Sequence, residues 1–321
     1  MTNLLALRDG GSTLGQIGRD HPLLPIGVGV FLYSTGPVFV QASSMSGPLF
    51  SFWRLWFGVG VLGLATLVGA HRLGGLPPPA AWRWPVGAGI AFAAHQLLLF
   101  SAVKTTSVAD VTLVTALSPI VTALLAAPVF HERPGMPFRL WSLVAMSGAG
   151  VVVFGGATGP RGDPVGMVLA LANVVAFAVF FLLSKGSRNH LPVLPFLFGV
   201  FAVAAIFVSA YLTFTGEEMA SFRAVDLVYA ATVAAGPGFL GHFVMTWPLG
   251  WVPANVPPVM RLGIPVLATM WAWWLLEEAV TWSHFVGGAI TFAGVAGALL
   301  SPSGRSFIRW RRQSRPVSRL C

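Results

Sequence analysis

The chain has 321 residues, of which 55% are hydrophobic and 9% are charged, and its formal net charge is +9. A soluble domain carries roughly 25% charged residues, so this composition excludes a water-soluble globular protein and indicates an integral membrane protein. Six of the basic residues lie in the C-terminal tail, where a cytoplasmic topology anchor is a better explanation than a nucleic-acid-binding site, so no nucleic-acid partner is expected.

Ten apolar segments are long enough to cross a bilayer, which takes about 20 residues of helix. In chain order they are residues 23–42, 49–70, 84–103, 107–130, 138–157, 164–185, 192–213, 225–247, 252–276 and 281–300. Residues 1–22 lack a signal peptide and are predicted to form a cytoplasmic tail, as are the basic residues 301–321. The predicted fold class is an all-α integral membrane protein with ten transmembrane helices.

A segment of the first half recurs in the second half, 146 residues later. Four pairs of residues align at this offset: Pro119 with Pro265, Ala126 with Ala272, Glu132 with Glu278, and Gly148 with Gly294. The two repeats, residues 23–157 and 164–300, contain five helices each, and an odd number makes the second repeat enter the membrane from the opposite side. Inverted repeats of this kind are typical of secondary transporters.

The distribution of basic residues agrees with this arrangement. With both termini in the cytoplasm, fourteen of the nineteen Lys and Arg residues lie in cytoplasmic regions and three in outer loops. This bias follows the positive-inside rule. The preference for arginine over lysine is typical of a GC-rich bacterial genome. We therefore expect a multi-pass protein of the bacterial plasma (inner) membrane with both termini cytoplasmic.

Several motifs point to a known family. The first half carries FSAVKTTSVA at residues 100–109, then Leu117-Ser118-Pro119 and Glu132-Arg133, and the second half carries Gly241-His242, Trp247, Val252-Pro253-Ala254, Pro265-Val266 and Glu277-Glu278. Over almost the whole chain this pattern resembles the EamA-type repeat of the drug/metabolite transporter superfamily. The resemblance implies a ten-helix carrier with a central cavity lined mainly by the first, third, fourth, sixth, eighth and ninth helices. The fifth and tenth helices would lie at the periphery.

Arg261 is the most informative candidate for substrate binding. It lies about nine residues into the ninth segment, or roughly 13 Å at the rise of an α-helix, which places it near the bilayer midplane. A guanidinium at that depth could hold a carboxylate or phosphate through two parallel hydrogen bonds. It could instead be structural and donate to carbonyl groups that neighbouring prolines leave without a partner.

The other candidate substrate-binding residues are polar or aromatic side chains within predicted helices: His242, Gln96, His95, Asn173, Tyr33 and Trp247. His242 and Gln96 occupy equivalent positions in the two repeats, as a two-fold site would require, although hydrogen bonds between packed helices are the alternative. If transport is coupled to protons, the histidines are the candidate carriers. For Trp247 an aromatic belt is the alternative. Arg54, near the end of the second segment, is expected to snorkel to the surface.

A second group of residues is assigned a gating or structural role. Pro119 and Pro265 would interrupt their helices at equivalent depths, and Pro37 would do the same in the first helix. Glu132 and Glu278 would end their helices at opposite surfaces and pair with nearby basic groups.

These observations favour a secondary transporter that exports a small metabolite, an amino acid or another carboxylate-bearing solute, by alternating access. Efflux of drugs or lipophilic cations, and flipping of a lipid-linked substrate, are the alternatives, but the first segment has no carboxylate to bind a cation. An intramembrane lipid-modifying enzyme is a remote alternative, because no predicted helix carries a pair of carboxylates at mid-depth. We expect no metal and no cofactor. The expected partners are the solute, membrane lipid and, if transport is coupled to protons, a proton, with the protein a monomer or homodimer.

Overall fold

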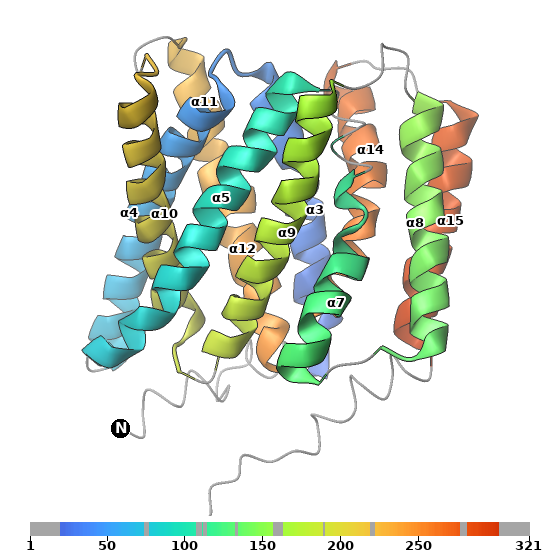
Figure 1. Cartoon of the computed structure of the whole chain (residues 1–321), viewed down its shortest axis with the longest axis horizontal. Helices are drawn as coiled ribbons and strands as arrows, with labels where there is room; N and C mark the ends of the chain where they lie inside the picture. Colours follow the sequence, from blue (N-terminus) through green and yellow to red (C-terminus); the bar gives the residue numbers. More distant parts are fainter. Residues whose placement is uncertain are drawn as a thin grey trace, which may run out of the picture.

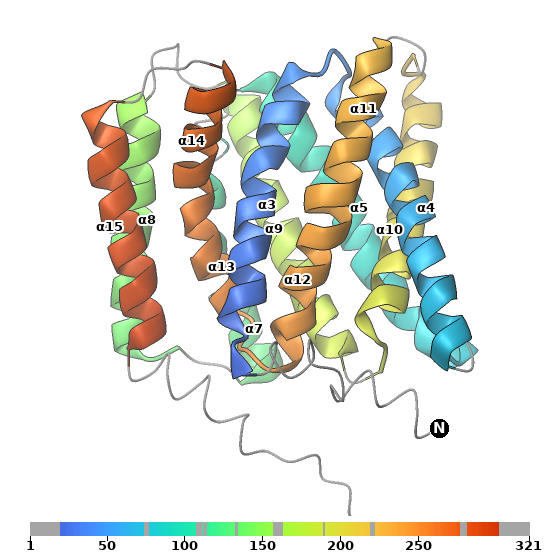
Figure 2. The same cartoon turned by 180° about the vertical axis from the view of Figure 1, so that it is seen from behind.

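The computed structural model describes residues 20–73, 77–106, 111, 114–131, 134–156, 163–188, 190–218, 222–276 and 281–301. Within these ranges the regular structure is entirely helical and contains no β-strand. Long apolar helices stand side by side in a single bundle, as Figures 1 and 2 show from opposite sides. An all-helical membrane fold is what the composition predicts, because a lipid-exposed helix satisfies its own backbone hydrogen bonds.

The helices follow the order of the predicted segments. The first half comprises α3 (Leu23–Ala42), α4 (Gly47–Leu73), α5 (Arg83–Thr105), α7 (Ser118–Phe130) and α8 (Met136–Gly156). The second comprises α9 (Pro164–Ser187), α10 (Val193–Thr215), α11 (Ala224–Val233), the π-helix η2 (Ala234–Gly241), α12 (His242–Thr246), α13 (Val256–Met260), η4 (Arg261–Gly263), α14 (Ile264–Leu276) and α15 (Trp282–Leu300). Two further 3₁₀ turns are η1 (Pro79–Trp82) and η3 (Trp247–Gly250).

Seven described helices are long and apolar enough to cross a membrane. Three shorter apolar helices, at Ser118–Phe130, Met136–Val152 and Val256–Ala268, fall within the predicted fourth, fifth and ninth segments. The number of ten crossings therefore stays a prediction. The lower face of the bundle is the end where α3 begins and α15 ends, at the bottom of Figure 1, and the upper face is the opposite end.

The fourth and ninth segments are not the continuous helices that the sequence predicts. α7 begins at Ser118 and α14 at Ile264, 146 residues apart, and each is a 13-residue helix with a proline in its first turn. By itself α7 is about 20 Å long, shorter than a bilayer core of about 30 Å, whereas α13, η4 and α14 follow one another directly from Val256 to Leu276. A proline has no amide hydrogen and is accommodated most easily in the first turn of a helix, where Pro119 and Pro265 lie. The prediction that Pro37 interrupts the first helix is wrong, because α3 is continuous through this residue.

Helices α8 and α15 pack against each other with a reciprocal set of contacts. A Cβ atom added to Gly148 would lie 2.4 Å from the backbone nitrogen of Thr291, and one added to Gly294 would lie 2.3 Å from the backbone nitrogen of Ala145. Thr291 and Ala145 are also 146 residues apart. Superposing each repeat on the other therefore maps one of these two contacts onto the other. The contact residues run in opposite directions along the chain, and α8 and α15 are therefore antiparallel.

The lower half of the bundle is filled by aromatic side chains. A phenylalanine cluster, formed by Phe92, Phe177, Phe180, Phe181, Phe196 and Phe201, belongs to the largest buried hydrophobic core. These side chains come from α5, α9 and α10. Three polar or charged residues of the helix interiors, Arg54, His95 and His242, lie against rings of this cluster.

Candidate functional site

A cavity of about 130 Å³ lies at mid-depth and extends toward the upper face. Its polar and charged lining residues are Tyr33, Arg54, His95, Gln96, Thr115, Ser118, His242 and Arg261. Apolar side chains such as Leu99, Phe100, Val103 and Phe177 complete the wall. The lining comes from the first, third, fourth, sixth, eighth and ninth predicted segments, and from Arg54 of α4 in addition.

Arg261 lies in η4, immediately before the start of α14, and lines this cavity. Its Nε and Nη1 atoms are buried and have no hydrogen-bond partner among the described residues. The guanidinium carbon lies 3.9 Å from the ring centroid of Phe177 and 5.5 Å from that of Tyr33. Aromatic faces stabilise the positive charge but accept no strong hydrogen bond. The guanidinium therefore has donors available for an acidic ligand.

Arg54 also lines the cavity, which corrects the expectation that it snorkels to the surface. Its side chain is 3% exposed, and its Nη1 atom donates to Oε1 of Gln96 at 2.6 Å. The guanidinium carbon lies between 5.7 and 5.9 Å from the ring centroids of Phe92, Phe100 and Phe201. The helical face explains the difference: Ser51 and Gly58, three and four residues from Arg54 along the helix, are both buried.

His242 and Tyr33 meet in the cavity. The Tyr33 hydroxyl and Nδ1 of His242 share a hydrogen bond of 2.6 Å. His242 follows the π-helix η2, which contains Pro237 and was not predicted. A proline inside a helix removes one backbone hydrogen bond, and a π-turn is one way in which a helix accommodates the defect. A Cβ added to Gly241 would lie 2.9 Å from the Tyr33 ring, so only glycine allows this close approach.

His95 of α5 and Asn173 of α9 form a second buried polar pair. Its Nδ1 atom lies 2.5 Å from Oδ1 of Asn173, a carbonyl oxygen that can only accept, so Nδ1 carries the proton. The other ring nitrogen of neutral His95 is then an acceptor. Asn173 is buried but does not line the cavity, and it positions the His95 ring.

Two helix N-termini face the cavity, one from each half. Ser118 at the start of α7, and Ile264 and Pro265 at the start of α14, belong to its lining. The first turn of an isolated helix has unpaired amide groups and the positive end of the helix dipole. Here the Ile120 amide donates to the Leu117 carbonyl oxygen and the Ile264 amide to that of Arg261, and α14 continues directly from α13 and η4. The positive charge of this cavity therefore comes from its two arginines.

Of the remaining residues predicted to bind substrate or to have a gating or structural role, some line the cavity and others do not. Pro37 and Pro265 line the cavity, whereas Pro119 lies in the first turn of α7 outside the lining. Trp247 stacks on Phe243, with ring centroids 6.0 Å apart, and does not line the cavity. Glu132 and Glu278 lie outside the described residues. No group of three His, Cys, Asp or Glu side chains that could hold a metal occurs in the described part of the chain.

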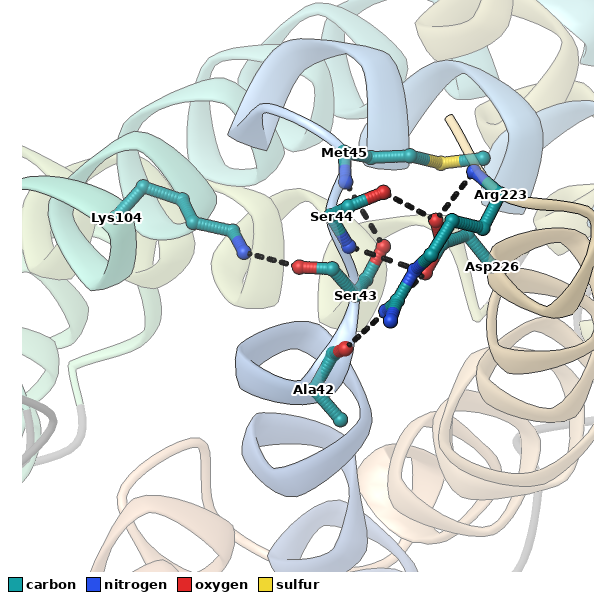
Figure 3. A network of polar contacts seen from close by, with 7 residues as sticks. All are labelled: Ala42, Ser43, Ser44, Met45, Lys104, Arg223 and Asp226. Carbon is teal, nitrogen blue, oxygen red and sulfur yellow. Dashed lines mark hydrogen bonds and ion pairs between the residues drawn. The ribbon is translucent and has the colours of Figure 1, made fainter. Parts of the chain in front are cut away.

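A polar network joins several elements at the upper face, and we call it the upper clamp (Figure 3). It consists of Ser43 and Ser44 between α3 and α4, Lys104 of α5, Arg223 immediately before α11, and Asp226 of α11. The Asp226 carboxylate accepts from Ser44 N at 3.0 Å, Ser44 Oγ at 2.5 Å and Arg223 N at 2.8 Å. Lys104 Nζ donates to the Ser43 carbonyl oxygen at 2.9 Å. The clamp therefore holds the upper ends of three helices that line the cavity.

The corresponding connection at the lower face is held by different chemistry. His190, between α9 and α10, stacks on Trp84 of α5 with ring centroids 4.4 Å apart and an interplanar angle of 11°. Lys185 Nζ near the end of α9 donates to the carbonyl oxygen of Val252 at 3.1 Å. The connection between α9 and α10 is the repeat counterpart of that between α3 and α4, so equivalent connections are fixed at opposite faces.

Comparison with known proteins agrees with the resemblance seen in the sequence. The model of the EamA-like transporter family matches residues 23–155 and, a second time, residues 164–300. The uncharacterized transporter YwfM of Bacillus subtilis is 26% identical over 289 residues, which are 87% of this chain and 93% of that protein. The uncharacterized transporter YdfC of the same organism is 24% identical over 209 residues, 64% of this chain and 67% of that protein. A solved crystal structure superposes with a TM-score of 0.70 at 21% identity, over 86% of this chain and 95% of that one, and shares its fold.

Proposed function

This chain belongs to the EamA-like transporter family, and from that premise we propose that it is a secondary transporter of a small carboxylate-bearing solute in the bacterial plasma membrane. The observation that carries the proposal is the electropositive cavity at mid-depth. Arg261 supplies two buried nitrogen atoms that have no partner among the described residues. A carboxylate accepts the hydrogen bonds that such a guanidinium offers.

The proposed mechanism is alternating access by two inverted repeats of five helices each. The matching starts of α7 and α14 and the reciprocal packing of α8 on α15 support a two-fold relation between the halves. A two-fold axis that exchanges two antiparallel helices is perpendicular to them, and for helices that cross a membrane it lies in the membrane plane. In this mechanism the upper clamp and the connection held by Trp84 and His190 close opposite ends of the cavity and open in turn.

The orientation follows from the distribution of basic residues. We place the lower face in the cytoplasm, because the basic tail of residues 301–321 follows α15 there and anionic lipid of the inner leaflet attracts it. The upper clamp then lies at the outer surface. The cavity is nearer to that surface, with the phenylalanine cluster between it and the cytoplasm.

The test is exchange of labelled solutes by purified protein in liposomes, screened against pooled amino acids, other organic anions and cationic dyes. The parent protein should exchange carboxylate-bearing solutes. Arg261→Gln should abolish that exchange while the protein stays folded and membrane-inserted, and Arg261→Lys should retain weak exchange because it keeps the charge and loses the planar fork. Exchange by Arg261→Gln at the parental rate, or competition by lipophilic cations alone, would contradict the proposal.

Export, the direction predicted from the resemblance, is measured separately. Cells loaded with the labelled solute should lose it faster when they express the parent protein than when they express Arg261→Gln. Faster uptake from the medium without faster loss would reverse the assigned direction and leave the solute class unchanged.

A further inference from the structure

The cavity has two positive charges and lacks negative ones. Arg54 and Arg261 both line it, and no described residue of the lining is Asp or Glu. A charged group deep in a bilayer is costly and is normally paired with an opposite charge. Gln96, the hydrogen-bond partner of Arg54, is a neutral amide and balances no charge. Two cations thus face a small space without a counter-ion among the described residues.

Neither guanidinium has its donors satisfied. The Nε atom of Arg54 and the Nε and Nη1 atoms of Arg261 are buried and have no partner among the described residues. Aromatic rings surround both groups, but a ring interacts with the charge and leaves the in-plane N–H groups available. Carboxylate oxygens accept hydrogen bonds from such charged N–H donors. Each arginine is therefore ready to accept an acidic group of a ligand.

The two arginines come from different halves of the protein. Arg54 is on α4 in the first family match, and Arg261 is on η4 in the second. A ligand with two acidic groups can pair with both arginines and so bind both halves at once. A ligand with a single acidic group, bound at Arg261, has no second negative charge to pair with Arg54. A ligand shifts a conformational equilibrium only when it interacts differently with the two states, and a contact that spans both halves has this property.

We propose that the physiological solute is a small organic dianion, with one carboxylate on Arg261 and the second on Arg54. This inference rests on the proposed transport function and narrows it. The volume of about 130 Å³ is close to the roughly 150 Å³ of a cavity that holds benzene, which fits a dicarboxylate of about four or five carbon atoms. An amino acid brings an ammonium group, and two guanidinium groups would repel it, so the cavity selects against a zwitterion.

Three four-carbon probes that differ at one end test the proposal. Liposomes with the parent protein are loaded with succinate, and uptake of labelled succinate is competed with unlabelled succinate, butyrate or 4-aminobutyrate. Succinate should compete at least about 10-fold better than either monocarboxylate, because losing one partner of a buried charge pair costs at least that factor. Butyrate or 4-aminobutyrate competing as well as succinate would overturn the proposal.

Variants then assign the second carboxylate to its arginine. Arg54→Gln should lower succinate exchange by on the order of 100-fold and remove the preference over butyrate, since the second charge loses its partner. Arg139→Gln is the matched control, because Arg139 is exposed on α8 and away from the cavity, and its exchange should equal that of the parent. A preference for succinate that survives in folded Arg54→Gln would overturn the assignment.

Different results would contradict the proposal of a dianion and the proposal of carboxylate transport. If butyrate or 4-aminobutyrate exchanges in an Arg261-dependent manner and succinate does not, carboxylate transport stands and the dianion is wrong. If none of these probes and no other carboxylate exchanges, the proposed function itself is wrong. The competition series uses the unaltered protein, so it decides the question even when Arg54→Gln does not fold.

Discussion

The contact between α8 and α15 makes a quantitative prediction about two glycines. Replacing Gly294 with alanine places a Cβ atom 2.3 Å from the backbone nitrogen of Ala145, and replacing Gly148 places one 2.4 Å from that of Thr291. Both obstacles are backbone atoms of the facing helix, so no side chain can rotate away. Ordinary contacts begin near 3.4 Å, and the helices must therefore move apart by about 1 Å in either variant.

The size of the effect follows from this displacement. A gap of about 0.5–1 Å forfeits roughly a quarter to a half of the dispersion energy of the atoms across it. Dispersion is the main force between helices in lipid, where no hydrophobic effect drives them together. Overpacking of this kind typically costs about 1–3 kcal/mol. Because the two contacts exchange with the repeats, the two variants should lose similar amounts of stability.

The assay is thermal unfolding of purified protein in detergent, followed by size-exclusion chromatography of the folded fraction. Gly60→Ala on α4 is the control, since nothing lies within 4 Å of its added Cβ and alanine favours the helix. We expect Gly148→Ala and Gly294→Ala to melt below the parent and Gly60→Ala to melt at or above it. If Gly294→Ala is as stable as Gly60→Ala, the close antiparallel packing and the two-fold relation built on it are wrong.

Three further predictions concern the site and the topology. Asp226→Asn should weaken the upper clamp by roughly 1–3 kcal/mol, because the amide lacks the negative charge that attracts the hydrogen-bond donors around it. The melting temperature in detergent should therefore fall, and an unchanged value would refute a clamping role. Tyr33→Phe should lower exchange and stability by breaking the 2.6 Å bond to its histidine partner while keeping the ring beside the arginine, and parental exchange would show that this bond is dispensable. The Cys321→Ser protein lacks cysteine and is the background for accessibility labelling. In it, Thr105→Cys should react with an impermeant maleimide in intact cells, and His131→Cys should react only after permeabilisation. The reverse pattern would invert the proposed orientation.

Much of the architecture could be predicted because it depends on length and composition. The positions of the apolar segments follow from hydropathy, and each overlaps observed helix. The repeat offset identified Pro119 and Pro265 as equivalent interruptions, and these residues lie in the first turns of α7 and α14. Of the polar residues predicted to bind substrate, Arg261 and His242 are among those that line one cavity.

The other features of the site depend on which face of a helix is buried and on how side chains pack, and the hydropathy of a segment gives neither. The distance of Arg54 from the end of its helix favours the surface, although the small residues at helical spacing from it, Ser51 and Gly58, are typical of a face that packs against another helix. The π-helix was missed because a fixed period of 3.6 residues was assumed across Pro237. The pairing of His95 with Asn173 depends on rotamers and on the spacing of α5 and α9, which no single segment encodes.

The phenylalanine cluster has a consequence for how turnover depends on temperature. Each aromatic side chain hides about 150–250 Å² of surface, and exposing apolar surface raises the heat capacity by about 0.45 cal/K/mol per Å². Opening the lower half to water would separate these rings, most of which are completely buried. That step would carry a positive activation heat capacity, whereas opening at the polar upper clamp would carry little. A curved Arrhenius plot would then identify opening at the lower face as the slow step.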